Sequence, residues 1–151
     1  MLAFLTKNHK NMKNLALMAV GISLALTACQ NNSETENQKL AAEAMKVHDE
    51  IMPQISSFDR STIKIDSILS NLTEIKASKA DLDTTATRQD LSNLKDSIEA
   101  ATDNMMVWMK DYDATSTDAA YQQKELDKIT AMKQQFERVG EHITKSLTPF
   151  N

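Results

Sequence analysis

AMKVHDEIMP, residues 44–53, decides how this chain folds, because its proline falls in the middle of a long helical pattern. Stripe-forming residues step by three and four on both sides of Pro53, from His48 on one side to Ile55 on the other. Such steps are typical of one face of a helix packed against its neighbours. A proline inside a helix costs about 3 kcal/mol and disfavours helical geometry in the residue before it. The stretch therefore allows a helix that continues through Pro53 with a kink, or a helix that breaks there.

The whole chain is rich in helix-forming residues and contains only two glycines and two prolines. The stripe keeps its phase through Pro53, and MPQISS offers little turn chemistry beyond the proline, so the pattern favours the continuous, kinked helix. Helices are predicted at about 37–80, 90–112 and 118–147. The predicted fold is an all-α, up-down-up three-helix bundle with a long first helix kinked at Pro53. The alternative is a four-helix bundle with a break at Pro53.

Polar segments separate the three predicted helices. Thr87-x-x-Asp90 and Thr115-x-x-Asp118 fit the capping-box pattern that opens a helix, which predicts the starts of the second and third helices. With a turn near residue 84, the second helix ends beside residue 56 of the first. Residues 37–55 are then predicted to have no partner within the chain.

This unpartnered segment carries an apolar stripe, which predicts a contact with another envelope protein or with a second copy of the chain. The residues of the predicted partner surface are Ala41, Ala44, His48, Ile51 and Ile55.

The N-terminus is typical of a secretory signal. Three lysines precede an apolar run that ends in Leu26-Thr27-Ala28-Cys29. These last four residues resemble the lipobox of bacterial lipoproteins, which implies that Cys29 is acylated and becomes the first mature residue. The predicted organisation is a signal peptide at 1–28, a polar disordered tether at 29–37 and a helical domain at 38–151. A second acceptable start at Met12 leaves the true first residue open.

Charge argues against nucleic-acid binding. The signal peptide holds three of the 17 basic residues and none of the 21 acidic ones, so its removal leaves a net charge of −7. Nucleic-acid phosphates are bound by basic patches, which an acidic domain does not favour. Cys29 is the single cysteine, so a lipid on it would leave no thiol for a disulfide or for catalysis.

No nucleophile elbow, glycine-rich loop or free thiol is visible, and the chain is predicted not to be an enzyme. No cofactor is assigned. A soft-metal site is the sharper alternative, because thioethers and imidazoles suit Cu(I). Its candidate ligands are His48, Met45, Met52, Met106 and Met109. In the continuous-helix fold these two groups are predicted to lie about 16 Å apart along the helix, and only a fold-back at Pro53 would join them.

A haem held by methionine and histidine is a weaker form of the same idea. The chain has no CxxCH motif, and His142 is predicted to lie about 50 Å from His48 along the bundle.

HDEIMP, MMVWM and a last helix rich in lysine and glutamine resemble a group of short lipoproteins from Bacteroidota-type bacteria. Some members carry the label "viral A-type inclusion protein", which specifies no mechanism. The resemblance implies an envelope lipoprotein, and Gln30 after the cysteine is compatible with the outer membrane. The predicted function is therefore a lipid-anchored, non-enzymatic protein that acts through protein–protein interaction.

Overall fold

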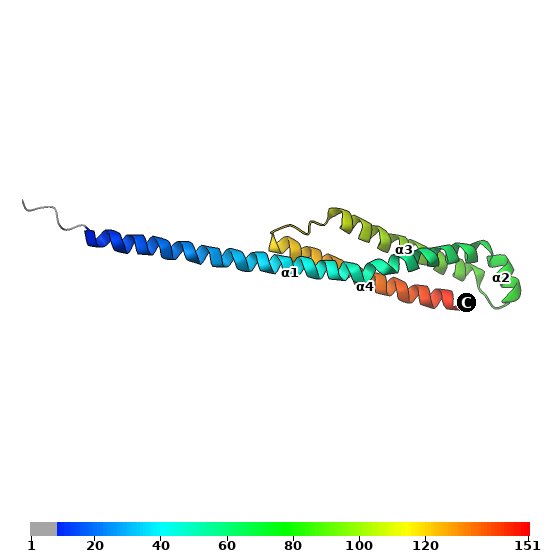
Figure 1. Cartoon of the computed structure of the whole chain (residues 1–151). Coiled ribbons are helices and arrows are strands. Elements are labelled where there is room, and N and C mark those ends of the chain that lie inside the picture. Colours follow the sequence, from blue (N-terminus) through cyan, green and yellow to red (C-terminus); the bar gives the residue numbers. More distant parts are fainter. Residues whose placement is uncertain (1–8) are drawn as a thin grey trace, which may run out of the picture.

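The computed structural model describes the backbone of residues 9–151 and the side chains of residues 35–151. This part of the chain is all-α, as the composition predicts. It consists of α1 (His9–Ser70), α2 (Leu72–Ser78), α3 (Thr84–Asp111), α4 (Ala119–Leu147) and the 3-10 turn η1 (Thr148–Phe150). Figure 1 shows α3 and α4 beside the C-terminal half of α1, while the N-terminal half of α1 extends beyond them.

Helix α1 continues through Pro53, so the alternative with a break at this residue is wrong. Proline cannot donate to the carbonyl four residues earlier, which here belongs to Asp49. Both Pro53 and Asp49 are exposed, so water can hydrate the freed carbonyl. Ile51, on the opposite face, is fully buried and keeps the helix packed across the proline.

The polar segment 29–37, predicted to be disordered, is helical because α1 runs through it. Asn37 at its end is buried, and its Nδ2 donates to the carbonyl of Thr117 in the α3–α4 loop. The predicted signal peptide at 1–28 and the predicted lipid on Cys29 lie in the part of the chain whose side chains are not described. Both stay predictions. Among the side chains described, no helix combines the length and apolarity needed to span a membrane.

Helix α3 begins earlier than the capping-box pattern predicts. Oδ1 of Asp83 accepts hydrogen bonds from the backbone N–H groups of Thr85 and Ala86, both at 3.0 Å. Asp83 is therefore the N-cap, and the predicted start at Thr87–Asp90 is wrong. The turn before it is closed by Lys76, whose Nζ donates to two backbone carbonyls between α2 and α3.

Helix α4 shows a related difference. Asp118 is itself the N-cap, since its Oδ1 accepts from the N–H groups of Ala120 and Tyr121. Thr115 lies three residues before the cap and bonds Asp113 instead, so the predicted capping box at Thr115–Asp118 is wrong. Aspartate competes well for such positions because its carboxylate also meets the positive end of the helix dipole.

The early start of α3 changes which residues of α1 face it. His48 of α1 stacks on Trp108 of α3. The turn about which these two helices pair is therefore centred on residue 78, midway between them in sequence, and not on residue 84 as predicted. When the centre of the turn between two antiparallel helices moves by one residue, the residue of α1 that faces a given residue of α3 moves by two. The end of α3 therefore lies beside residues of α1 that are much nearer its N-terminus than predicted. The predicted unpartnered segment 37–55 is therefore packed within the chain.

The predicted partner surface is part of the bundle's own interior, and this prediction is wrong. Ala41, Ala44 and Ile51 are buried, while His48 and Ile55 are half-buried. The stripe was placed correctly on α1, but α3, α4 and their connecting loop cover it.

The core runs along the seam between the three long helices. The rings of Phe58 and Phe136 stack with centroids 5.0 Å apart and link α1 to α4. Lys133 of α4 also pairs with Glu50 of α1 at 2.6 Å, which lowers the pKa of the Glu50 carboxyl through the hydrogen bond and the nearby positive charge. The core contains one further group of large, fully buried side chains: Ile65, Leu72, Leu91, Leu94, Met105 and Ile129.

A buried amide holds the α3–α4 loop. The Nε2 of Gln122, fully buried, donates to the carbonyls of Asp113 and Ser116 at 3.0 and 3.1 Å. Its Oε1 accepts from the hydroxyl of Tyr112 at 2.9 Å. One buried side chain thus makes three hydrogen bonds to the residues that connect α3 to α4.

We predict that Pro53→Ala raises the free energy of unfolding by about 1–3 kcal/mol. Alanine restores the missing N–H and has a high helix propensity, although it also loosens the unfolded chain. Urea unfolding followed by circular dichroism at 222 nm measures the change. Ser56→Ala, exposed on the same helix, measures the propensity gain alone. A destabilised Pro53→Ala variant would contradict a helix that is continuous at this position.

We predict that Gln122→Ala lowers the free energy of unfolding by about 2–3 kcal/mol, because it removes three hydrogen bonds and leaves a cavity where a fully buried side chain was. The neighbouring Gln123→Ala is the matched control. Gln123 is exposed and bonds only Asp127, so its loss should cost less than about 0.5 kcal/mol. Equal effects of the two substitutions in urea unfolding would show that the loop does not depend on the buried amide.

Candidate functional site

A row of stacked rings crosses the bundle near the α3–α4 loop. His48 stacks on Trp108 with ring centroids 5.9 Å apart and an interplanar angle of 30°. Trp108 stacks on Tyr112 at 4.5 Å, and Tyr112 on Tyr121 at 6.5 Å. The row joins α1, α3 and α4, and it leaves the His48 side chain only 13% exposed.

The imidazole of His48 is held by its own neighbour. Its Nδ1 lies 3.0 Å from Oδ1 of Asp49. A neutral imidazole that donates from Nδ1 to a carboxylate keeps the lone pair of Nε2 free to accept a proton or bind a metal. Within residues 35–151, Nε2 makes no hydrogen bond.

Four methionines lie near the level of His48 along the bundle, on the faces of α1 and α3 that meet. Met45 and Met52 lie three residues before and four residues after His48, so all three share one face of α1. Met106 and Met109 follow Lys95 by 11 and 14 residues, about three and four turns of α3. We call Met45, Met52, Met106 and Met109 the methionine seam.

Lys95 identifies that face of α3 as the one beside α1. Its Nζ lies 2.6 Å from Oδ1 of Asp66, and Asp66 follows His48 by 18 residues, about five helical turns. Together with the His48–Trp108 contact, this pair places Met109 opposite positions 47–52 of α1. The prediction that a continuous helix keeps His48 about 16 Å from Met109 is therefore wrong.

The methionine seam is accessible to solvent. Met45 is 37% exposed, Met109 41% and Met106 54%, whereas Met52 is half-buried against the core. Met105, the remaining methionine of MMVWM, is fully buried. The structure thus separates one core methionine from four that border the surface.

Trp108 also has a buried polar atom without a partner. Its indole Nε1 finds no hydrogen-bond acceptor among the described residues, and neither does Oδ1 of the buried Asn37 find a donor. Both residues lie near the α3–α4 loop. Unsatisfied buried groups lower stability, so these two atoms offset part of the stabilisation that ring packing and the Gln122 hydrogen bonds give to this end of the bundle.

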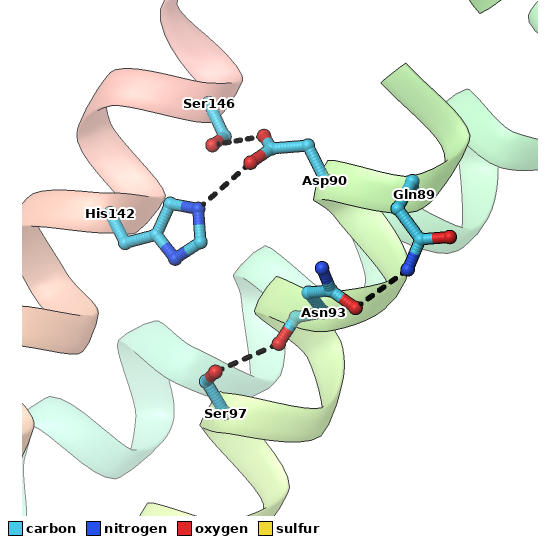
Figure 2. A network of polar contacts seen from close by, with 6 residues as sticks. All are labelled: Gln89, Asp90, Asn93, Ser97, His142 and Ser146. Carbon is cyan, nitrogen blue, oxygen red and sulfur yellow. Dashed lines mark hydrogen bonds and ion pairs between the residues drawn. The ribbon is translucent and has the colours of Figure 1, made fainter. Parts of the chain in front are cut away.

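A second cluster lies near the other end of the bundle, where α3 meets α4. Figure 2 shows Asp90 of α3 pointing toward His142 and Ser146 of α4. Nε2 of His142 is 3.1 Å from Oδ1 of Asp90, and the hydroxyl of Ser146 donates to Oδ2 at 2.5 Å. On the same helix, Gln89 donates to Asn93.

The residue types of this cluster match a hydrolytic triad, but their order does not. In a triad the histidine lies between serine and aspartate and removes the serine proton. Here Asp90 lies in the middle, and the hydroxyl of Ser146 is bonded to the carboxylate. The arrangement therefore clamps α3 to α4 and does not activate the hydroxyl.

Asp90 is stabilised in its charged form. The hydrogen bond from Ser146 and that from His142 hold the pKa of the Asp90 carboxyl below its usual value, against a smaller effect of burial. The sequence predicted neither contact, although His142 and Ser146 stand four residues apart and so share one face of α4.

The two histidines whose side chains are described, His48 and His142, lie too far apart to share a haem. His48 stacks on Trp108 and His142 contacts Asp90, and these partners stand 18 residues apart on α3, about 27 Å. This distance is shorter than the predicted 50 Å, because α3 starts earlier. Among residues 35–151, no three histidine, cysteine, aspartate or glutamate side chains converge to form a metal site.

Comparison of the chain with known protein families, curated proteins and solved structures finds no significant match in any of the three.

We predict that Asp90→Asn makes the domain less sensitive to acid. Because the pKa of Asp90 is lower in the folded chain, its contribution to stability is present above the unfolded value, near pH 4, and is lost as the pH falls through the folded pKa. Wild type should therefore lose more stability than Asp90→Asn between about pH 5 and pH 3. Urea unfolding at several pH values measures the difference. Asp103→Asn, on the exposed face of the same helix, should follow wild type, and an Asp90→Asn curve parallel to wild type would contradict the clamp.

Proposed function

We propose that this chain is a lipid-anchored helical bundle of a bacterial envelope that acts by binding another protein and not by catalysis. The signal-like N-terminus, the lipobox-like sequence before Cys29 and the resemblance to short envelope lipoproteins support the anchor. The acidic domain argues against nucleic acid as the partner.

One observation carries the binding proposal, namely the exposed methionine seam. Most of the large apolar side chains left exposed among the described residues belong to it: Met45, Met106 and Met109, beside Ile63 and Val107. Exposed apolar residues that gather in one place mark interaction sites more often than scattered ones do. Methionine is also suited to such surfaces, since its flexible thioether adapts to irregular partners.

The position of the seam fits a partner in or near the membrane. Met45 follows Cys29 by 16 residues, and α1 is helical throughout this interval, so the two lie about 24 Å apart along the helix. A lipid on Cys29 would hold the seam close to the bilayer, within reach of other envelope proteins. We therefore place the partner surface on the exposed methionine seam and not on the buried stripe of α1.

The binding proposal predicts that charge placed on the seam abolishes partner capture. A photo-crosslinking amino acid at position 106 of the full-length lipidated chain should give a discrete crosslinked species on membranes. Met45→Lys together with Met109→Lys should abolish it, because lysine cannot be buried in an apolar contact without a large cost. Mass spectrometry of the crosslinked band identifies the partner.

Ile63, also exposed on α1 but outside the seam, provides the matched control. A crosslinker at position 63 should give no specific species, and Ile63→Lys should leave capture at position 106 unchanged. Cys29→Ser should release the chain from the membrane and weaken capture there. Crosslinking that is equal at positions 63 and 106, or that survives the lysine variant, would refute the seam as the binding surface.

A further inference from the structure

We propose that the methionine seam is also a binding site for one Cu(I) ion, held by Nε2 of His48 and the thioethers of Met52 and Met109. Met45 and Met106 border this site on either side. The inference goes beyond the proposed partner binding and does not depend on it. It rests on the register of α1 against α3, on the fixed imidazole and on the kind of donor atoms present.

The register brings the donors to one level of the bundle. Met52 follows His48 by one turn on the same face of α1. Met109 of α3 lies opposite positions 47–52, as set by the His48–Trp108 and Lys95–Asp66 contacts. Two donors on one helix and a third on the helix packed against it are the arrangement by which bundles build metal sites.

The imidazole is prepared to act as a ligand. Asp49 lies 3.0 Å from Nδ1 of His48, and such a carboxylate on the second ring nitrogen is the usual companion of metal-binding histidines. A neutral imidazole that donates from Nδ1 to this carboxylate leaves Nε2 free to bind a metal. The stacked indole of Trp108 holds the ring plane, so little conformational freedom is lost when an ion binds.

The donor set selects a soft cation. Thioethers bind Cu(I) well and bind Zn²⁺, Mg²⁺ or Ca²⁺ poorly. The hard ligands that those ions need do not converge anywhere in residues 35–151. Asp49, the carboxylate beside His48, is already used to orient the imidazole.

Trp108 supplies a direct reporter, because it is the single tryptophan of the chain and contacts the proposed ligand ring. The full-length chain is titrated with Cu(I) under anaerobic, reducing conditions against a chromogenic Cu(I) chelator. We expect one ion per chain, with quenching of the Trp108 fluorescence that saturates at the same ratio.

Isosteric variants test the ligands without disturbing the fold. Met52→Leu with Met109→Leu removes both sulfurs at nearly constant volume and should weaken Cu(I) binding by about tenfold or more, or about 1.4 kcal/mol. His48→Phe keeps a ring against Trp108 and should have a similar effect. Met132→Leu, which removes a half-buried methionine of α4 outside the seam, should bind like wild type.

The His48→Phe variant also separates this inference from the proposed function. It leaves all four methionines of the seam in place, so partner capture should persist while Cu(I) binding is lost. Cu(I) affinity that is unchanged in both the leucine and phenylalanine variants would overturn the site. So would binding without any change in Trp108 fluorescence, or an affinity too weak to compete with the chelator. None of these outcomes bears on partner capture.

Discussion

The continuity of α1 across Pro53 is the constraint on which the rest of the structure depends. Both α3 and α4 pack along this one helix, so a break there would remove the surface that joins them. The proline is tolerated because it lies on the exposed face, where water can reach the carbonyl that it cannot bond. Ile51 and Phe58 on the opposite face remain buried. The stability gained by burying an uninterrupted apolar stripe thus outweighs the low helix propensity of Pro53.

The two loops determine which residues of α1 face α3 and α4. Asp83 and Asp118 cap α3 and α4, and Gln122 fixes the chain between them. In an antiparallel pair, a helix that starts six residues earlier also ends against a different part of its partner. The early cap at Asp83 therefore brings Trp108 onto His48 and covers the segment that would otherwise be unpartnered.

The helical class and the buried stripe of α1 could be predicted from sequence, since both follow from periodicity and composition. The register could not. Thr87 and Asp90 form as good a capping pattern as Asp83 does, and only packing decides between them. Asp90 instead turns toward α4 and pairs with His142 and Ser146, a contact across 52 and 56 residues that no local pattern contains. The wrong distance between His48 and Met109 and the wrong partner surface on α1 both follow from the wrong register.

The corrected register changes how the exposed methionines are interpreted. With α3 displaced along α1, His48 would be a polar residue in an exposed stripe, and Met106 and Met109 would be unrelated to it. In the structure they lie near the level of His48, whose imidazole contacts Asp49 and is mostly buried, while Met106 and Met109 are exposed. Bundles normally bury such long apolar side chains, as Met105 is buried one position earlier. Leaving neighbouring methionines exposed costs the fold part of its hydrophobic stabilisation, and a partner that covers the seam or a soft ion that binds to it would account for this cost.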